Sequence, residues 1–317
     1  MIDATIADDA QIDVSFVIAS YNSGNFLVPA VLSALGQSGV RVEVIIIDDG
    51  STDGSLEVAQ ELSKQDDRVR VIRTAVNSGP GGARNLGLHE MRGNWYAVLD
   101  SDDLIKPERS RYLIDVATAN NADLIADDLE IFGDEVTTHR LVNFDIEEDQ
   151  FEVTLDSYFE RSLLFGKRPG YGFLKPMIHS RVIRAETLRY DERLRVGEDD
   201  ELIVRLLASG YRYLLVNRPF YMYRKHGHSI SHRLSVKNAQ KMVETEHKIQ
   251  KRLGEQAKSK LYRRRYASIK TGLSFVESIE KIKSGALFSA ISILLRRPAA
   301  ILLYKIPIMA ALGRWRR

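Results

Sequence analysis

The sequence predicts an α/β fold, in which a mostly parallel sheet flanked by helices is followed by a basic helical extension. Short apolar runs alternate with segments of helical periodicity in the first half of the chain, and this alternation is typical of parallel sheets covered by helices. Charge divides the chain as well. Residues 1–247 carry 28 basic and 40 acidic residues, whereas residues 248–317 carry 17 basic and only 3 acidic residues. We therefore expect one domain over residues 1–232 and a separate amphipathic extension over residues 233–317.

The apolar runs locate the elements of the first domain. Each run is short and bounded by turn residues, as expected for buried strands, and they fall at residues 14–19, 42–47, 69–72, 95–99 and 122–126. Helical patterns lie between them, through residues 27–35, from Ser55, over residues 83–91 and from Pro107, which takes the first-turn position that proline prefers. Residues 133–154 are acidic and irregular, so we expect a surface excursion there.

Composition excludes several classes of protein. The chain has 317 residues, of which 44% are hydrophobic and 28% are charged, which excludes a disordered or collagen-like chain. There are no cysteines, so disulfides, cysteine nucleophiles and thiolate metal sites are excluded. The first ten residues are acidic and carry no basic residue, so no signal peptide is expected, and a cytoplasmic location fits both observations.

Polar clusters follow three of the predicted strands. They are Tyr21-Asn22, Asp48-Asp49 and the segment Asp100-Ser101-Asp102-Asp103. Because α/β sheets bind ligands beyond the carboxyl ends of their strands, the clusters predict one shared binding site.

The acidic segment 100–103 predicts a cation. Its three carboxylates repel one another unless a cation lies among them, and oxygen-only ligation suits Mg²⁺ or Mn²⁺, whose sites often include substrate phosphates. The alternative is a solvated turn that caps the helix from Pro107. The position directly after a buried strand favours the metal.

A glycine-rich segment over residues 79–85 contains Arg84. It fails the G-x-G-x-x-G pattern, since Arg84 takes the last glycine position, and no P-loop Gly-Lys-Ser/Thr follows. A loop that places Arg84 near a helix N-terminus favours a phosphate or a polar base edge. A glycine-rich turn with a solvated arginine is the alternative.

A third candidate site is the acidic helix start that contains Asp199. Asp199 shares a helix face with the apolar stripe of Leu202, Ile203 and Leu206, so partial burial is expected to make its carboxylate a general base. Simple capping of the helix dipole is the alternative. Farther along, His226 is a candidate ligand for a metal or a phosphate, although an isolated surface histidine usually has neither function.

Taken together, these segments resemble the family 2 glycosyltransferases, which are inverting nucleotide-sugar enzymes with the GT-A fold. The resemblance is carried, in chain order, by VSFVIASYNSGNFL, IIIDDGSTDGS, NSGPGGARNLGL, WYAVLDSDD, VGEDDELIVRLL and YRKHGHSIS. It spans residues 14–231 and is closest to bacterial exopolysaccharide enzymes of the succinoglycan type. Ala19 departs from the proline of many relatives. The Q-x-x-R-W segment of processive synthases is missing after Asp199, which argues against a processive polymerase.

The resemblance implies a role for each candidate residue. The nucleotide would be held by Tyr21, Asn22, Asp48, Asp49, Arg84 and Asp100. The D-x-D pair Asp100 and Asp102 would contact ribose and metal, and Asp103 and His226 would complete the site for Mg²⁺ or Mn²⁺ or the diphosphate. Asp199 would be the catalytic base, and Glu198 would orient the acceptor.

The implied activity is a metal-dependent, inverting transfer from a nucleotide-sugar, with UDP-hexose as the expected donor. The expected acceptor is a lipid-linked oligosaccharide in exopolysaccharide biosynthesis. A soluble or protein acceptor is one alternative, and a binding module without catalysis is another. The presence of Asp100, Asp102 and Asp199 argues against the second.

The basic extension predicts attachment to a membrane surface. Arginine clusters at residues 263–265, 296–297 and 314–317 flank two apolar stretches, 285–295 and 298–313. Neither stretch offers the roughly 20 apolar residues of a membrane span, but both suit an interfacial helix on anionic lipid. We therefore expect a peripheral location on the inner face of the cytoplasmic membrane. A helical appendage packed on the domain or on a second subunit is the alternative, and without a recognition motif a nucleic-acid partner is not expected.

Overall fold

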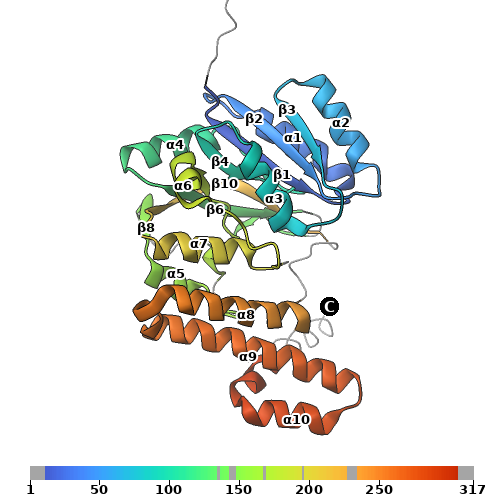
Figure 1. The fold of residues 1–317 in the computed structure, drawn as a ribbon, viewed down its shortest axis with the longest axis vertical. Coiled ribbons are helices and arrows are strands. Elements are labelled where there is room, and N and C mark those ends of the chain that lie inside the picture. The colour runs from blue at the N-terminus through green and yellow to red at the C-terminus, as the bar shows by residue number, and fades with distance from the viewer. Residues whose placement is uncertain are drawn as a thin grey trace, which may run out of the picture. The chain divides into compact units, whose positions relative to one another are not determined.

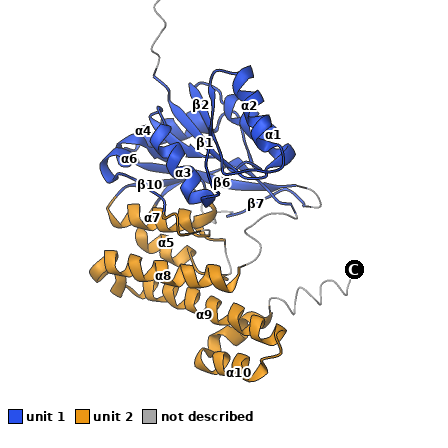
Figure 2. Cartoon of the chain, turned by 45° about the vertical axis from the view of Figure 1, so that its right-hand side comes forward, with its two compact units in different colours: residues 1–152, 174–190, 211–226 blue, residues 153–173, 191–210, 227–317 orange. Residues whose placement is uncertain are grey.

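The computed structural model describes residues 11–133, 136–142, 148–166, 169–194, 196–226 and 234–305, which form two compact units (Figures 1 and 2). The first unit comprises Met1–Glu152, Leu174–Tyr190 and Tyr211–His226, and the second comprises Val153–Phe173, Asp191–Gly210 and Gly227–Arg317. The units are therefore interleaved along the chain, whereas the sequence predicted one boundary after residue 232. Segments 153–173 and 191–210 belong to the same unit as the basic extension.

The first unit is built on a mixed sheet. Its strands run in the order β3-β2-β1-β4-β9-β6-β10-β5, and β7 pairs with β6. The bounds are β1 Val14–Ser20, β2 Val42–Asp48, β3 Val69–Arg73, β4 Trp95–Val98, β5 Leu104–Ile105, β6 Leu124–Phe132, β7 His139–Arg140, β9 Met177–His179 and β10 Tyr213–Arg224. All five predicted strands are present. The short strand β9 is antiparallel to both β4 and β6, so the sheet is less uniformly parallel than the sequence predicted.

The core lies on both sides of β1, β2 and β4. Every residue of β2 and β4 is buried, as are all but one residue of β1. Burial on both faces explains why these strands read as continuous apolar runs rather than as alternating patterns. Helix α3 (Gly79–Glu90) lies very close to β1 at Gly87, because a Cβ atom at Gly87 would lie 2.2 Å from a methyl carbon of Val17.

The other helices of the first unit begin after strands or turns. They are α1 (Leu27–Leu35), which follows the short helix η1 (Gly24–Phe26), α2 (Ser55–Gln65), α4 (Arg109–Ala119) and α6 (Ser180–Glu186). Helices α1 and α2 pack against each other and on β2. The segments that follow β1, β2 and β4 hold the candidate residues Tyr21, Asn22, Asp49, Asp100, Asp102 and Asp103, whereas Asp48 ends β2 and Arg84 lies in α3.

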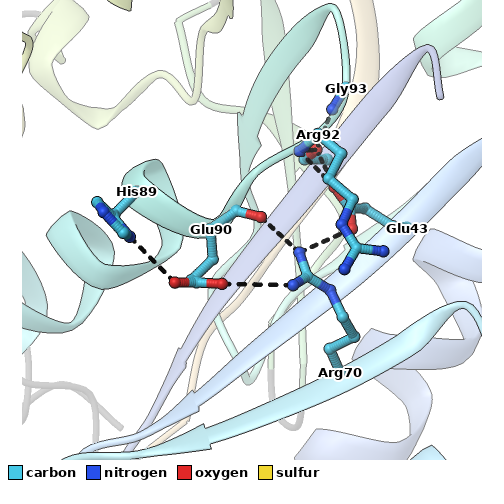
Figure 3. A network of polar contacts seen from close by, with 7 residues as sticks. Glu43, Arg70, His89, Glu90, Arg92 and Gly93 are labelled. Atoms are coloured by element: carbon cyan, nitrogen blue, oxygen red, sulfur yellow. Dashed lines mark hydrogen bonds and ion pairs between the residues drawn. The ribbon is translucent and has the colours of Figure 1, made fainter. Parts of the chain in front are cut away.

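A polar network holds together the amino ends of the same strands (Figure 3). The buried carboxylate of Glu43 accepts hydrogen bonds from the Ser15 hydroxyl at 2.6 Å and the Arg92 backbone N–H at 2.7 Å, and it pairs with Arg70 at 3.0 Å. Arg70 also pairs with Glu90 at 3.5 Å. Because buried charges need partners, this network accounts for a glutamate in a core strand without assigning it a function.

The second unit is helical. It contains α5 (Leu155–Arg161), η2 (Tyr171–Phe173), α7 (Glu198–Ala208), α8 (Val236–Leu253), η4 (Gly254–Lys258), α9 (Lys260–Lys283), α10 (Leu287–Arg296) and η5 (Pro298–Tyr304). The chain first passes from one unit to the other within strand β8 (Gln150–Val153). Helix α9 packs on α5, α8 and α10, and the rings of Phe159 and Tyr262 meet in the core of this unit at 5.2 Å.

Candidate functional site

The loop after β1 is tied to the loop after β2. Asn22 adopts a left-handed backbone conformation (φ 51°), which asparagine tolerates better than most residues. Its backbone N–H donates to the Ser51 hydroxyl at 3.0 Å, and its side-chain oxygen accepts from the Thr52 N–H at 2.8 Å. Tyr21, next to it, is 52% exposed. Asn22 therefore fixes the loop, while the Tyr21 ring is accessible to a ligand.

Asp48 presents a buried acceptor that lacks a partner. It ends β2, pairs with Ser20 in the strand register and is 1% exposed. Its Oδ2 atom accepts from the Ser51 N–H at 3.3 Å. No donor among the described residues reaches its Oδ1 atom. An unsatisfied buried acceptor is costly, and because this atom has almost no exposed surface, the loops around it would have to move before a ligand N–H group could donate to it.

Asp49 organises the loop that leads into α3. Its Oδ1 atom accepts from Thr74 Oγ1 at 3.0 Å and from the Ser78 N–H at 2.8 Å, and its Oδ2 atom accepts from the Gly79 N–H at 2.7 Å. Both oxygens are thus used within the protein. This geometry shows that Asp49 holds the α3 N-terminus in place, and its contact with a nucleotide base stays a prediction.

Asp100 and Arg84 contact each other. Arg84 is buried and pairs with Asp100 Oδ1 at 2.8 Å, while Lys175 pairs with Oδ2 at 2.9 Å. Burial would raise the pKa of Asp100, but attraction to Lys175 and Arg84 lowers it to about 2. The carboxylate is therefore ionised throughout the neutral range. No local pattern in the sequence selects Lys175, which becomes part of the site only because Leu174–Tyr190 returns to the sheet.

Asp102 lies against His226. The distance from Asp102 Oδ2 to His226 Nε2 is 2.8 Å, and the side chains are 31% and 15% exposed. The His226 ring stacks on Phe26 with a centroid distance of 4.8 Å. The two residues are 124 positions apart in sequence, yet the fold brings these two predicted metal ligands together.

Asp103, in contrast, is enclosed by the protein. It is 1% exposed and accepts hydrogen bonds from Tyr221 Oη at 2.9 Å and from the Arg224 N–H at 2.6 Å. Burial, with repulsion from Asp100 and Asp102, raises its pKa well above the usual range. These contacts anchor β10 to the D-x-D turn, and the role of Asp103 at the metal or diphosphate site stays a prediction.

Asp102 and His226 bring one carboxylate and one imidazole together. A carboxylate oxygen suits Mg²⁺ or Mn²⁺, and magnesium-type sites commonly add substrate phosphates to one or two carboxylates. Within the ranges that the structure describes, no three His, Asp or Glu side chains form a metal-holding group. Asp100 is already neutralised by Arg84 and Lys175, so its surroundings favour nucleotide binding over metal ligation.

The second unit holds the remaining candidates at the start of α7. Gly197 precedes the helix with a left-handed backbone (φ 82°). Glu198 is buried and Asp199 is partly buried, in agreement with the predicted position of Asp199 at the head of the apolar stripe. Leu202, Ile203 and Leu206 are buried along that stripe. Partial burial is compatible with the predicted role of Asp199 as a base.

Asp200 is held by a buried ion-pair cluster. It pairs with Arg265 of α9 and accepts from Tyr158 Oη of α5 at 2.9 Å. Arg265 also pairs with Glu246 of α8 at 2.6 Å, and the Arg265 side chain is only 3% exposed. The sequence grouped Arg265 with a basic surface cluster, because its acidic partners are distant in sequence. The cluster connects the helix of Asp199 to the basic extension.

Comparison with known proteins identifies a family and related chains. Residues 15–175 match the model of "Glycosyl transferase family 2". The chain is 35% identical to the succinoglycan biosynthesis protein ExoO of Rhizobium meliloti (strain 1021), over 97% of this chain and 88% of ExoO. It is 34% identical to ExoU of the same organism, over 70% of this chain and 65% of ExoU.

Two solved structures share the fold. One is S. aureus TarS 1–349 in complex with UDP, with a TM-score of 0.61, 18% identity and coverage of 85% of this chain and 72% of that chain. The other is the mannosyltransferase PcManGT from Pyrobaculum calidifontis in complex with GDP-Man and Mn²⁺. It has a TM-score of 0.55 and 14% identity, and the match covers 96% of this chain and 81% of that one.

Proposed function

The chain belongs to glycosyl transferase family 2, and from this premise we propose that it transfers one sugar from a UDP-hexose, with inversion, to a lipid-linked oligosaccharide. The acceptor would be an intermediate of exopolysaccharide assembly, because the related ExoO and ExoU are succinoglycan biosynthesis proteins. The enzyme would work peripherally at the inner face of the cytoplasmic membrane, where such an acceptor is anchored.

The observation that carries the donor proposal is the unpartnered oxygen of Asp48. A uracil ring has an N–H group that can donate a hydrogen bond to this carboxylate oxygen. Tyr21, which follows the Ser20 that pairs with Asp48 in the strand register, offers an exposed ring on which the base can stack. TarS has been solved in complex with UDP and, separately, in complex with UDP-GlcNAc. PcManGT was solved with GDP-Man, so guanine donors belong in the test.

The D-x-D turn would receive the diphosphate. Asp102 and His226 would hold Mg²⁺ or Mn²⁺, which when bound neutralises negative charge on the departing nucleoside diphosphate. Asp100 would orient the ribose side of the donor, and its contacts with Arg84 and Lys175 fix it in place. These cations preorganise the carboxylate, so little rearrangement is needed when a donor binds.

Asp199 would act on the acceptor. Its carboxylate takes the proton of the acceptor hydroxyl while the hydroxyl oxygen attacks the anomeric carbon from the face opposite the diphosphate. One bond to carbon forms as the bond to the diphosphate oxygen breaks, so the configuration inverts in a single step. Glu198 would orient the acceptor. No enzyme nucleophile is required, in keeping with a chain that has no cysteine.

A donor and acceptor screen tests this proposal. Full-length protein with Mn²⁺ would be incubated with UDP-glucose, UDP-galactose, UDP-GlcNAc or GDP-mannose, and with lipid-linked or free oligosaccharide acceptors. We expect transfer from a UDP-hexose to the lipid-linked acceptor and a β-linkage, by NMR, from an α-linked donor. Transfer only from GDP-mannose would refute the UDP-hexose donor. Transfer only to soluble or protein acceptors would refute the lipid-linked acceptor, and a product with retained configuration would refute the inverting mechanism.

Replacing Asp102 by Ala tests the proposed metal pair. The variant is expected to lose the gain in UDP affinity that Mn²⁺ gives the wild type, which we expect to be at least about tenfold, or ~1.4 kcal/mol, because His226 alone remains. Calorimetric titration of UDP with and without Mn²⁺ measures the difference. The matched control is Asp115→Ala, since Asp115 forms an exposed ion pair with Arg111 on α4. An unchanged Mn²⁺ dependence in Asp102→Ala would show that Asp102 only supports the turn.

A further inference from the structure

The C-terminal end of the described chain exposes an apolar surface. We define the α10–η5 face as Leu287, Phe288, Ile291, Leu295, Ile301 and Leu302, all of which are more than half exposed. Phe288 reaches 91% and Leu295 reaches 74%. Single exposed apolar residues are common, but six within 16 residues form a patch of the kind that marks an interaction site.

The face is a continuous stripe on α10. Positions 287, 288, 291 and 295 fall within about 100° of the helix circumference at 3.6 residues per turn. Ala290, outside this stripe, is 2% exposed, and α10 packs on α9 within the second unit. Helix α10 is thus attached to its own unit by one side and leaves its large apolar side chains uncovered by the residues that the structure describes.

The charge around the face is predominantly positive, although the exposed Glu280 precedes Lys281. Residues 281–305 contain Lys281, Lys283, Arg296, Arg297 and Lys305 and no acidic residue. Lys281, Lys283, Arg296 and Lys305 are exposed. A second copy of the chain in a symmetric contact would place these cations against one another. An anionic surface would instead pair with them, so charge complementarity favours lipid over self-association.

The geometry suits a position on a bilayer rather than across it. Among the described helices, no single one is long and apolar enough to span a membrane. Helices α10 and η5 reach the required length and composition only together, and they are bent by 115° at their junction. A bent apolar pair with basic residues at both ends is typical of an element that lies in the interface between headgroups and acyl chains.

We propose that the α10–η5 face inserts its apolar side chains into an anionic bilayer surface and holds the enzyme there reversibly. The proposal deepens the proposed function, on which it rests for the membrane-anchored acceptor. Lys281, Lys283, Arg296 and Lys305 contact anionic headgroups, and Phe288 and Leu295 supply the deepest apolar contact. Binding therefore weakens with salt, since screening reduces the attraction between exposed charges.

Vesicle flotation of the full-length protein tests the proposal without substrates. Phosphatidylcholine vesicles with and without phosphatidylglycerol would be compared at low and high salt. The variants are Phe288→Ser/Leu295→Ser and Lys281→Gln/Arg296→Gln. The matched control is Leu32→Ser, which removes an exposed leucine (56%) from α1 of the first unit. Point variants are preferred to deletion because Ala290 and Ala300 are buried.

We expect the wild type to bind anionic vesicles only, and to bind them less at high salt. Binding to these vesicles should fall at least tenfold in both double variants and should not change in the control. UDP affinity is expected to stay at the wild-type value in all variants, which separates loss of the surface from loss of the fold. Equal binding of wild type and variants, or equal binding to neutral vesicles, would overturn the proposal. A wild-type dimer that Phe288→Ser/Leu295→Ser dissociates would assign the face to a second copy instead. Failure of sugar transfer leaves the flotation result intact, so the two proposals fail independently.

Discussion

Replacing Asp199 by Asn is expected to lower kcat by about 10²–10⁴-fold, the usual contribution of a general base, while the Kd for UDP stays near the wild-type value. The amide has nearly the same size but cannot take a proton from the acceptor hydroxyl. Asp199 heads the apolar stripe of α7, whereas Asp48, Asp100 and Asp102 lie in the other unit, so the nucleotide contacts remain. Steady-state transfer rates and calorimetric UDP binding measure the two effects.

The control for this result is Glu201→Gln on the same helix. Glu201 pairs with Arg205 one turn away at 3.0 Å, and the two side chains are only 15% and 14% exposed. Gln keeps the size of Glu201 and can still hydrogen-bond, so this variant should leave transfer close to wild type. If Asp199→Asn transfers sugar as fast as the wild type, another group takes the proton. If both variants lose activity to the same degree, the loss reflects damage to α7 rather than to a base.

Replacing Arg265 by Met is expected to destabilise the protein by about 3–5 kcal/mol, because it leaves the buried Glu246 and the partly buried Asp200 with no countercharge. The guanidinium is the shared partner of both carboxylates, from α7 and α8, and is 3% exposed. The expected observation is an unfolding transition at a lower denaturant midpoint. Transfer should fall as well where the variant remains folded, because Asp200 adjoins Asp199.

Two variants separate the ion-pair effect from a general effect of mutating α9. Arg263→Met, two residues earlier, removes an exposed arginine that donates to the Lys258 carbonyl, and it should change stability little. The triple variant Arg265→Met/Asp200→Asn/Glu246→Gln removes the buried charges together and should recover much of the lost stability. If Arg265→Met is as stable as Arg263→Met, the buried cluster contributes nothing to the second unit.

The sequence predicted best the strands that are buried on both faces, because such strands consist of continuous apolar residues. Strands β1 and β2 are continuous apolar runs for that reason. Strand β9 has only three residues, Met177–His179, too few to show a period. Strand β10 contains Pro219 and shifts register beside it, which obscures the strand pattern. In the sheet, β9 lies between β4 and β6, and β10 lies between β6 and β5. These neighbours are distant in sequence, so packing rather than local propensity decides where the two strands lie.

Some residues of the candidate site could likewise be predicted from the sequence, and others could not. Asp48, Asp100 and Asp102 could be selected because each follows a buried strand directly. Two of the residues that contact them, Arg84 and His226, were candidates as well, but Lys175, Tyr221 and Arg224 were not. Lys175 is 75 positions away from Asp100, and Tyr221 and Arg224 reach Asp103 from β10. Asp49 and Asp103 show the same effect, because the residues that donate hydrogen bonds to their carboxylates are distant in sequence and no local pattern indicates them.

The interleaving of the two units also affects the order in which a newly made chain can fold. Asp200 and Arg265 are 65 residues apart, and ribosomes add about 5–20 residues per second, so Asp200 is synthesised about 3–13 s before its partner. Helices α5 and α7 leave the exit tunnel without α8 and α9, which bury them. During that interval their apolar stripes are open to chaperones, proteases or other nascent chains. A truncated product that ends before α9 would lack the partner of Asp200 permanently, so only chains that extend through α9 can close the second unit.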